Sequence, residues 1–318
     1  MDKTKKKFLR RSLGWLSLKL FTILSGRRYL KWDYLLGDII GKLGYIFALR
    51  HRRIASGSLR IAFPDWDNKK RIDVCKKCFI FIAQSSLEVF YFLNYPKALE
   101  NIRIEGENYL KEALSLGKGV IGLTAHLGNF PLMSMKLAYL GYVVNVMARP
   151  MRDEKVGDYL HNLRSNAKVK TILSYPRKEC VNQTLKVLRN NEIVIIQMDQ
   201  NFGTGGVWVK FFNRLAATPV GPIVFSLRTG AVILPMYIRR EGLGRHYIKI
   251  FSPFNMEIKD DKDESILVNA IRITKLIEDW IVETPWEWGG WIHRRWKSEP
   301  SSKVESMKFK VQKDVTAI

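Results

Sequence analysis

The sequence predicts an α/β fold in which a mostly parallel sheet is flanked by helices. From Ile102 onward, short apolar segments rich in Val, Ile and Leu alternate with segments whose apolar residues recur at helical spacing. Strands that alternate with helices form a parallel sheet covered on both faces. The residues before Ile102 show helical spacing throughout, which predicts an all-helical N-terminal region.

The N-terminal region is also where charge and apolar residues suggest a membrane contact. The chain carries 53 Lys and Arg against 30 Asp and Glu, a net charge of +23. Such an excess indicates a polyanionic partner, namely nucleic acid, an anionic membrane or a phosphorylated substrate. A basic cluster precedes the apolar segment 13–24, which is shorter than the roughly 20 residues that span a bilayer. This segment is either a helix lying in the membrane plane or an amphipathic helix packed on the domain, and its basic flank favours the first.

Three segments are therefore expected: a membrane-associating N-terminal helix in residues 1–30, a main domain in 31–298 and a polar tail in 299–318. The main domain begins with helices at 34–49 and 68–93, separated by a break at Phe63-Pro64. Cys75 and Cys78 have the spacing of a redox or zinc motif. No second pair accompanies them and they lie in a helical pattern, which favours two partly buried thiols in a reducing setting.

The α/β part follows in order along the chain. Strands are predicted at 102–104, 119–126, 143–149, 171–173, 193–199, 207–212, 231–239 and 247–251. Helices are predicted at 108–116, 130–140, 158–165, 179–189, 219–228 and 265–282. No phosphate-binding loop, dinucleotide fingerprint, serine nucleophile motif or zinc-ligand cluster occurs, so the sequence predicts neither a cofactor nor a metal.

The strand at 119–126 delivers His126 to its carboxyl end, the edge of a parallel sheet where ligands bind. Asn129 is a plausible N-cap of the next helix, and Pro131 fits its first turn. His126 then lies beside a helix N-terminus, where N–H groups near Gly128 and Asn129 could hold a phosphate or a developing oxyanion. The alternative is a histidine packed in a strand–helix corner.

Two later strands also end in polar groups, Arg149 and the pair Asp199-Gln200. The unperturbed pKa of an imidazole lies close to neutral pH, which suits His126 to act as a general base. An arginine such as Arg149 can bind a phosphate or carboxylate through two N–H groups. Asp199 could orient a histidine, bind a cation or cap a turn. A surface arginine is the alternative for Arg149.

Several separated motifs together resemble the bacterial lipid A late acyltransferases. They occupy residues 60–64, 125–130, 149–150, 199–203, 209–212, 217–222, 229–235, 285–288 and 291–297. The resemblance implies a glycerol-phosphate acyltransferase-like fold on the cytoplasmic face of the bacterial inner membrane. It also implies a reaction that moves a fatty acyl chain from acyl carrier protein to a hydroxyl of a lipid A precursor.

One position departs from the pattern of these acyltransferases, which place an Asp or Glu five residues after the histidine. Here that position is Pro131, and by analogy with serine proteases the loss of an orienting carboxylate can lower a rate about 10⁴-fold. Three explanations are open. Asp199 supplies the carboxylate, Asn129 or a main-chain carbonyl holds the imidazole tautomer, or the chain is a catalytically impaired relative that binds lipid or carrier protein. We favour an active enzyme, because His126, Arg149 and Asp199 all remain.

The resulting hypothesis is direct acyl transfer, with His126 as the base, Asp199 as its support and Arg149 as the group that positions a phosphate. Gly128, Asn129, Gln200, Arg294 and Arg295 are the predicted substrate-binding residues, the two arginines through lipid phosphates. Alternatives are an acyltransferase with another glycolipid or a lysophospholipid as acceptor, and a silent binding protein. Nucleic-acid binding is disfavoured, because no DNA- or RNA-binding motif is present.

Overall fold

The computed structural model describes residues 15, 22, 29–151, 153–203 and 205–298. The predicted membrane-associating helix in 1–30 therefore lies almost entirely outside the described residues, as does the predicted tail 299–318. Within the described part, no helix is both long enough and apolar enough to cross a bilayer.

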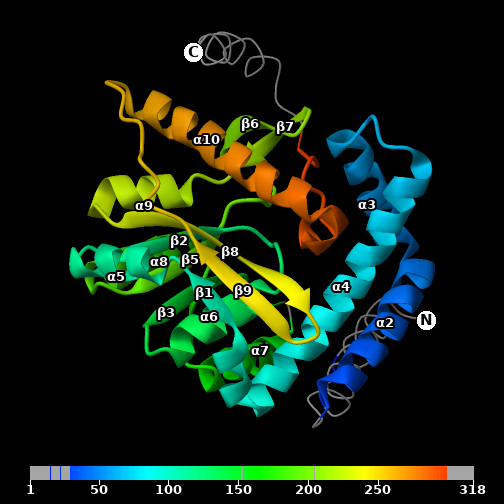
Figure 1. The fold of residues 1–318 in the computed structure, drawn as a ribbon. Coiled ribbons are helices and arrows are strands. Elements are labelled where there is room, and N and C mark those ends of the chain that lie inside the picture. Colours follow the sequence, from blue (N-terminus) through cyan, green and yellow to red (C-terminus); the bar gives the residue numbers. More distant parts are fainter. Residues whose placement is uncertain (1–14, 16–21, 23–28, 152, 204, 299–318) are drawn as a thin grey trace, which may run out of the picture.

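The N-terminal region is helical, as predicted. Helix α2 (Leu30–Phe47) lies alongside the long helix α4 (Asn68–Asn94), with α3 (Leu49–Ala62) between them in sequence (Figure 1). Two glycines of α2 permit close packing of α2 on α4. A Cβ at Gly41 would lie 2.4 Å from the Cα of Ile80, and one at Gly37 would lie 2.8 Å from the Cα of Gln84.

The main sheet has seven strands in the order β1-β9-β8-β2-β5-β3-β4, and only the β8–β9 pair is antiparallel. Its strands are β1 (Arg103–Glu105), β2 (Val120–Thr124), β3 (Val144–Ala148), β4 (Val169–Leu173), β5 (Ile193–Gln197), β8 (Val232–Gly242) and β9 (Arg245–Ile250). The predicted mostly parallel α/β sheet is confirmed.

Helices pack on both faces of this sheet (Figure 1). They are α5 (Glu107–Ser115), α6 (Phe130–Tyr139), α7 (Glu154–Asn166), α8 (Arg177–Arg189), α9 (Gly221–Thr229) and α10 (Lys262–Glu283), with 3₁₀ turns at Pro96–Asn101, Pro285–Glu287 and Gly289–Ile292. The central strands divide their side chains between two apolar cores. Ile121 of β2 packs with α8, α9 and α10, whereas its neighbour Val120 packs with α5 and α6. This alternation on a strand apolar throughout is that of a sheet buried on both faces.

One strand was not predicted. Strand β7 (Arg214–Thr218) pairs antiparallel with β6 (Val207–Phe211) in a separate two-stranded sheet beside α10. The segment Leu215-Ala216-Ala217 has weak β propensity, so its pairing depends on the tertiary contacts of the hairpin rather than on a local pattern.

Candidate active site

His126 lies in the turn after β2 and is joined to Asp199, which follows β5. The parallel register sets Thr124 opposite Gln197, so residues two positions beyond each strand end lie at the same edge of the sheet. The His126 Nδ1 is 2.8 Å from Asp199 Oδ1, and the main-chain N–H of His126 donates to Oδ2 at 3.0 Å. The convergence predicted for these two strand ends is therefore present as a direct hydrogen-bonded pair.

The Asp199 carboxylate is buried, and both of its oxygens accept hydrogen bonds. The indole Nε1–H of Trp288 donates to Oδ2 at 2.7 Å, in addition to the two His126 groups. Burial raises the pKa of Asp199, but the charge of His126 and the hydrogen bonds from His126 and Trp288 outweigh it and lower that pKa to about 2. Asp199 is consequently an anion at neutral pH.

This anion determines the state of the imidazole. Burial lowers the pKa of His126, but the charge of Asp199 and its hydrogen bond act more strongly together and raise that pKa above its usual 6.5. In the neutral ring the Nδ1 proton is donated to Asp199, which leaves the lone pair on Nε2. That atom is 3.1 Å from the side-chain nitrogen of Gln200, and the His126 side chain is 25% exposed. The neutral ring therefore has its basic nitrogen directed at Gln200, on a side chain that is partly exposed.

Trp288 belongs to a C-terminal segment that is paired with the His126 turn. Leu127 and Trp288 form an antiparallel bridge, and the Gly289 N–H donates to the His126 carbonyl at 2.8 Å. The Gly128 N–H donates to the Glu287 carbonyl at 3.1 Å. Gly128 has φ of +63°, and a Cβ there would lie 1.9 Å from the Ile238 carbonyl oxygen. Because its N–H is already paired, the expectation that Gly128 supplies an oxyanion donor is corrected; a role for the Asn129 N–H stays a prediction.

The three predicted arginines have different environments. Arg149 follows β3, which is separated from β2 by β5; it is exposed and has no hydrogen bond or ion pair with the described part of the chain. Arg294 is also exposed. Arg295 is buried, donates to the Ala217 carbonyl at 2.6 Å and to Thr218 Oγ1 at 2.7 Å, and burial lowers its pKa to about 10. The expectation that Arg295 binds lipid phosphate was wrong, because this guanidinium anchors the C-terminal segment to β7.

Comparison with known proteins identifies the family of this chain. The model of a family described as bacterial lipid A biosynthesis acyltransferase matches residues 2–298. This chain belongs to that family. The lipid A biosynthesis lauroyltransferase of Escherichia coli is 26% identical over 274 residues, 84% of this chain and 86% of that protein. The lipid A biosynthesis acyltransferase of Haemophilus influenzae is 25% identical over 270 residues, 81% of each chain. A phosphatidylinositol mannoside acyltransferase of Mycobacterium tuberculosis is 28% identical over 142 residues, 44% of this chain and 45% of that protein.

The structure around Pro131 bears on which group supplies the carboxylate that this position lacks. Pro131 lies in the first turn of α6, as predicted, and a proline side chain cannot accept a hydrogen bond from the His126 ring. Asn129 is the N-cap residue, but its side chain makes no capping hydrogen bond. It donates instead to Glu88 Oε2 at 2.8 Å and to the Ser85 carbonyl at 3.1 Å, so Asn129 is buried against α4. Of the explanations left open for Pro131, the structure supports Asp199 as the source of the carboxylate.

Glu88 is a part of the site that sequence reasoning did not assign. This buried side chain accepts hydrogen bonds from Asn129, from His246 Nε2 at 2.8 Å, from Arg240 at 3.1 Å and from the Tyr34 hydroxyl. Burial raises its pKa, but the hydrogen bond and charge of His246 and the charge of Arg240 prevail and lower it to about 2. Glu88 thereby fixes the start of α6 behind the His126 turn. Its sequence signal was a lone acid on an apolar helical face, which does not identify the partners.

Proposed function

We propose that this acyltransferase moves a fatty acyl chain from an acyl thioester to a hydroxyl of a lipid A precursor, with His126 as general base. The observation that carries the proposal is the hydrogen-bonded Asp199–His126 pair, in which Nδ1 faces the carboxylate and the lone pair of the neutral ring is on Nε2. An oriented imidazole with a free lone pair can accept the proton of an alcohol. Transfer to a lipid A or other glycolipid acceptor also agrees with the names of the relatives.

The proposed reaction needs no covalent acyl-enzyme. His126 Nε2 accepts the proton of the acceptor hydroxyl, and the oxygen attacks the thioester carbonyl to form a tetrahedral intermediate. As that intermediate collapses, the C–S bond breaks and the imidazolium returns its proton to the leaving thiolate. Asp199 stays ionised throughout and stabilises the imidazolium, as the aspartate does in serine proteases.

Gln200 occupies the place where the acceptor must approach. Its side-chain nitrogen, 3.1 Å from His126 Nε2, donates to the lone pair that the reaction uses. The incoming hydroxyl therefore replaces the Gln200 amide at Nε2, and the released amide becomes available to a neighbouring polar group of the substrate. In this proposal Gln200, predicted from sequence as a substrate-binding residue, binds the substrate after it leaves His126.

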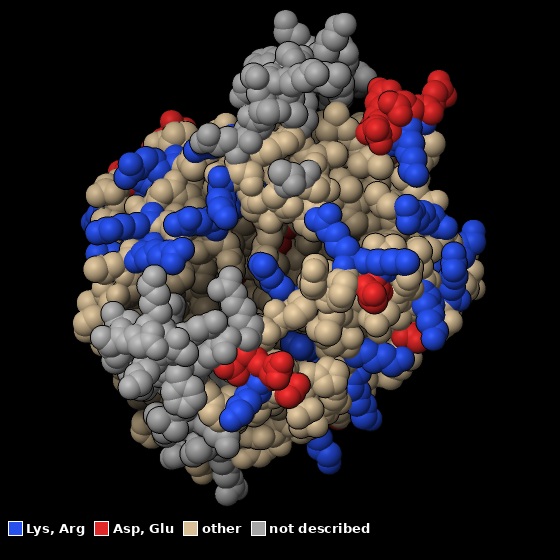
Figure 2. Space-filling model, turned by 180° about the vertical axis from the view of Figure 1, so that it is seen from behind, with Lys and Arg blue, Asp and Glu red and all other residues tan. Residues whose placement is uncertain are grey.

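The donor and the location are supported by charge. Figure 2 shows Lys and Arg side chains on both sides of a hollow on the face opposite to that of Figure 1. A cationic face suits an acidic acyl carrier protein and the anionic inner membrane at its cytoplasmic side. In this proposal Arg149 and Arg294, both exposed, contact acceptor phosphate or the phosphopantetheine of the carrier.

Lipid mass spectrometry tests the proposal and separates it from its alternatives. Cells that express wild-type protein should contain a lipid A species one acyl chain heavier than cells that express His126→Ala. If the extra chain appears on another glycolipid, the acceptor differs, an alternative favoured by the similarity to a phosphatidylinositol mannoside acyltransferase. Identical lipid profiles, together with measurable binding of lipid or carrier protein, would select the silent binding protein.

A further inference from the structure

A cavity of about 340 Å³ lies between α3 and α4, and its walls carry four arginines. We call it the arginine pocket; the lining residues used below are Arg52, Arg53, Ser56, Arg60 and Arg71. Within the described residues, the hydrogen bonds and ring contacts of His126, Asp199 and Trp288 involve none of them.

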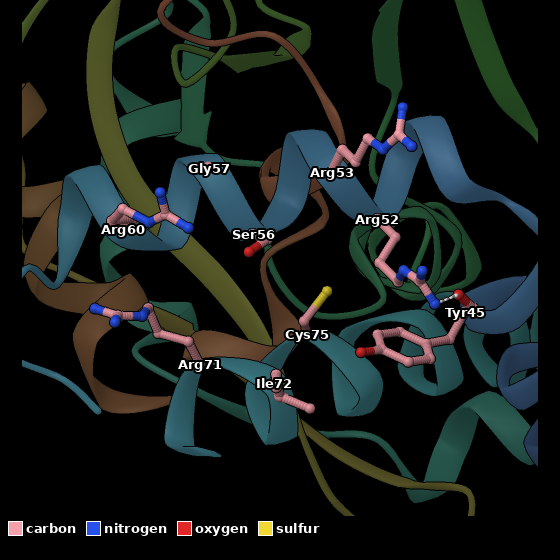
Figure 3. Close-up of a pocket in the computed structure, with 9 residues that line it drawn as sticks. All are labelled: Tyr45, Arg52, Arg53, Ser56, Gly57, Arg60, Arg71, Ile72 and Cys75. Atoms are coloured by element: carbon pink, nitrogen blue, oxygen red, sulfur yellow. Dashed lines mark hydrogen bonds between the residues drawn. The ribbon is translucent and has the colours of Figure 1, made fainter. Parts of the chain in front are cut away.

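The arrangement follows from helical spacing. Arg52, Ser56 and Arg60 recur every four residues and therefore share a face of α3. Figure 3 shows Arg60 on α3 and Arg71 on α4 on facing sides of the pocket, with the Ser56 side chain directed from α3 toward α4. The Arg71 guanidinium donates to the carbonyls of Phe63 and Pro64 at 3.3 and 3.2 Å, contacts that hold it in place at the α3–α4 corner.

The positive charges that line the pocket have no anionic partner among the described residues. Within residues 29–151, 153–203 and 205–298, none of the four arginines forms an ion pair. Of the acidic residues in 65–73, Asp67 caps α4 by accepting the Lys70 N–H, Asp73 pairs with Lys77 at 2.7 Å, and Asp65 is exposed and forms no ion pair with the described residues. Arg52 reaches neutral groups, the Tyr45 carbonyl at 3.5 Å and the Tyr45 ring, whose centroid is 5.2 Å from the guanidinium carbon. Like charges around one cavity repel each other, and a bound anion relieves that repulsion.

We propose that the arginine pocket binds a phosphate monoester, either free or carried by a lipid headgroup. Guanidinium groups pair with phosphate oxygens through two parallel N–H bonds, and a dianion matches several arginines better than a single carboxylate does. The Ser56 hydroxyl adds a neutral donor. A concave site fits a compact anion, whereas acidic protein surfaces and nucleic acid present charge over an extended area. The proposal does not depend on acyl transfer and stands if that activity is absent.

Two variants separate binding in the pocket from attraction to a basic surface. Ser56 lines the pocket, and its side chain is directed from α3 toward α4 (Figure 3), so Ser56→Leu places a bulky side chain in the pocket without removing charge. Leucine is also a better helix former than serine, which favours retention of the fold. Arg60→Gln removes one charge and breaks no hydrogen bond to the described part of the chain. The control is Arg189→Gln, an equal charge change at an exposed residue at the end of α8.

Binding is measured by calorimetry with inorganic phosphate and with glucosamine 1-phosphate at constant ionic strength. A parallel assay uses flotation with phosphatidylcholine vesicles that contain phosphatidic acid. Wild type and Arg189→Gln should bind saturably and equally. Arg60→Gln and Ser56→Leu should bind at least about ten-fold more weakly, the loss expected for one charged hydrogen bond, while circular dichroism shows an intact fold.

Each outcome decides the proposal. Pocket-dependent binding of the soluble phosphates identifies a free or sugar phosphate, and pocket-dependent binding of the vesicles alone identifies a lipid headgroup; both support it. The proposal is overturned if Arg60→Gln and Arg189→Gln lose binding equally, or if Ser56→Leu binds fully, because either result would show diffuse charge attraction. Pocket-dependent binding of RNA or an acidic protein without binding of either phosphate probe would also overturn it.

Discussion

The indole of Trp288 is hydrogen bonded to the carboxylate of Asp199, with Nε1 and Oδ2 2.7 Å apart. These residues are far apart in sequence, yet both are buried at the edge of the sheet where His126 lies. A donor from the C-terminal segment thus fixes the anion that orients the imidazole. Three separate parts of the chain, those that carry His126, Asp199 and Trp288, therefore form the site together.

Removal of the Asp199 charge should impair the chemical step more than substrate binding. Asp199→Asn retains the size of the side chain but no longer stabilises an imidazolium, so we expect kcat to fall roughly 10³- to 10⁴-fold with a small change in KM. Steady-state transfer assays with the purified protein measure both parameters. A variant with near-normal kcat would return the question to other groups around the ring.

The pH dependence of transfer should follow the imidazole. The base must be neutral and its pKa is raised in the folded protein, so kcat/KM should rise with pH through an apparent pKa above 6.5. In Asp199→Asn the charge that raises this pKa is absent, so the residual activity should have its acid limb at lower pH. An acid limb at the same pH in both proteins would contradict the assignment.

The indole N–H of Trp288 should matter apart from its bulk. Trp288→Phe preserves an aromatic ring but removes one donor to the Asp199 carboxylate, and we expect kcat to fall roughly 10- to 100-fold. Trp291→Phe is the matched control, because Trp291 is equally buried and donates instead to the Pro285 carbonyl at 2.6 Å. It should lose stability but little activity; equal losses of kcat would reduce Trp288 to a packing residue.

Glu88 should stabilise the fold in a pH-dependent way. Its pKa is lowered to about 2 from an unfolded value of about 4.3, so its contribution is complete above the unfolded value and is lost as pH falls through the folded one. Glu88→Gln leaves the Arg240 charge buried without its anion, which typically costs about 3–5 kcal/mol.

Thermal unfolding from pH 7 to pH 3 measures this contribution. The difference in Tm between wild type and Glu88→Gln should be largest near pH 7 and should shrink as pH falls toward 3. A difference that does not change with pH would show that Glu88 acts through packing rather than charge.

Part of the site followed from the sequence because parallel strands align their ends. That rule predicted that His126 and Asp199 would meet, and they do. It did not give strand order: β3, which leads to Arg149, pairs with β5 rather than with β2. Contacts between distant segments leave no local pattern in a single sequence. They account for the hydrogen bond of Trp288 to Asp199, the donors around Glu88 and the burial of Arg295.

The role of His126 as general base is tested most directly by transfer from acyl carrier protein to a lipid A precursor with purified His126→Ala. The account predicts that Tm and vesicle binding stay near wild-type values while the rate falls at least about 10³-fold. Wild-type turnover by a folded His126→Ala protein would contradict it.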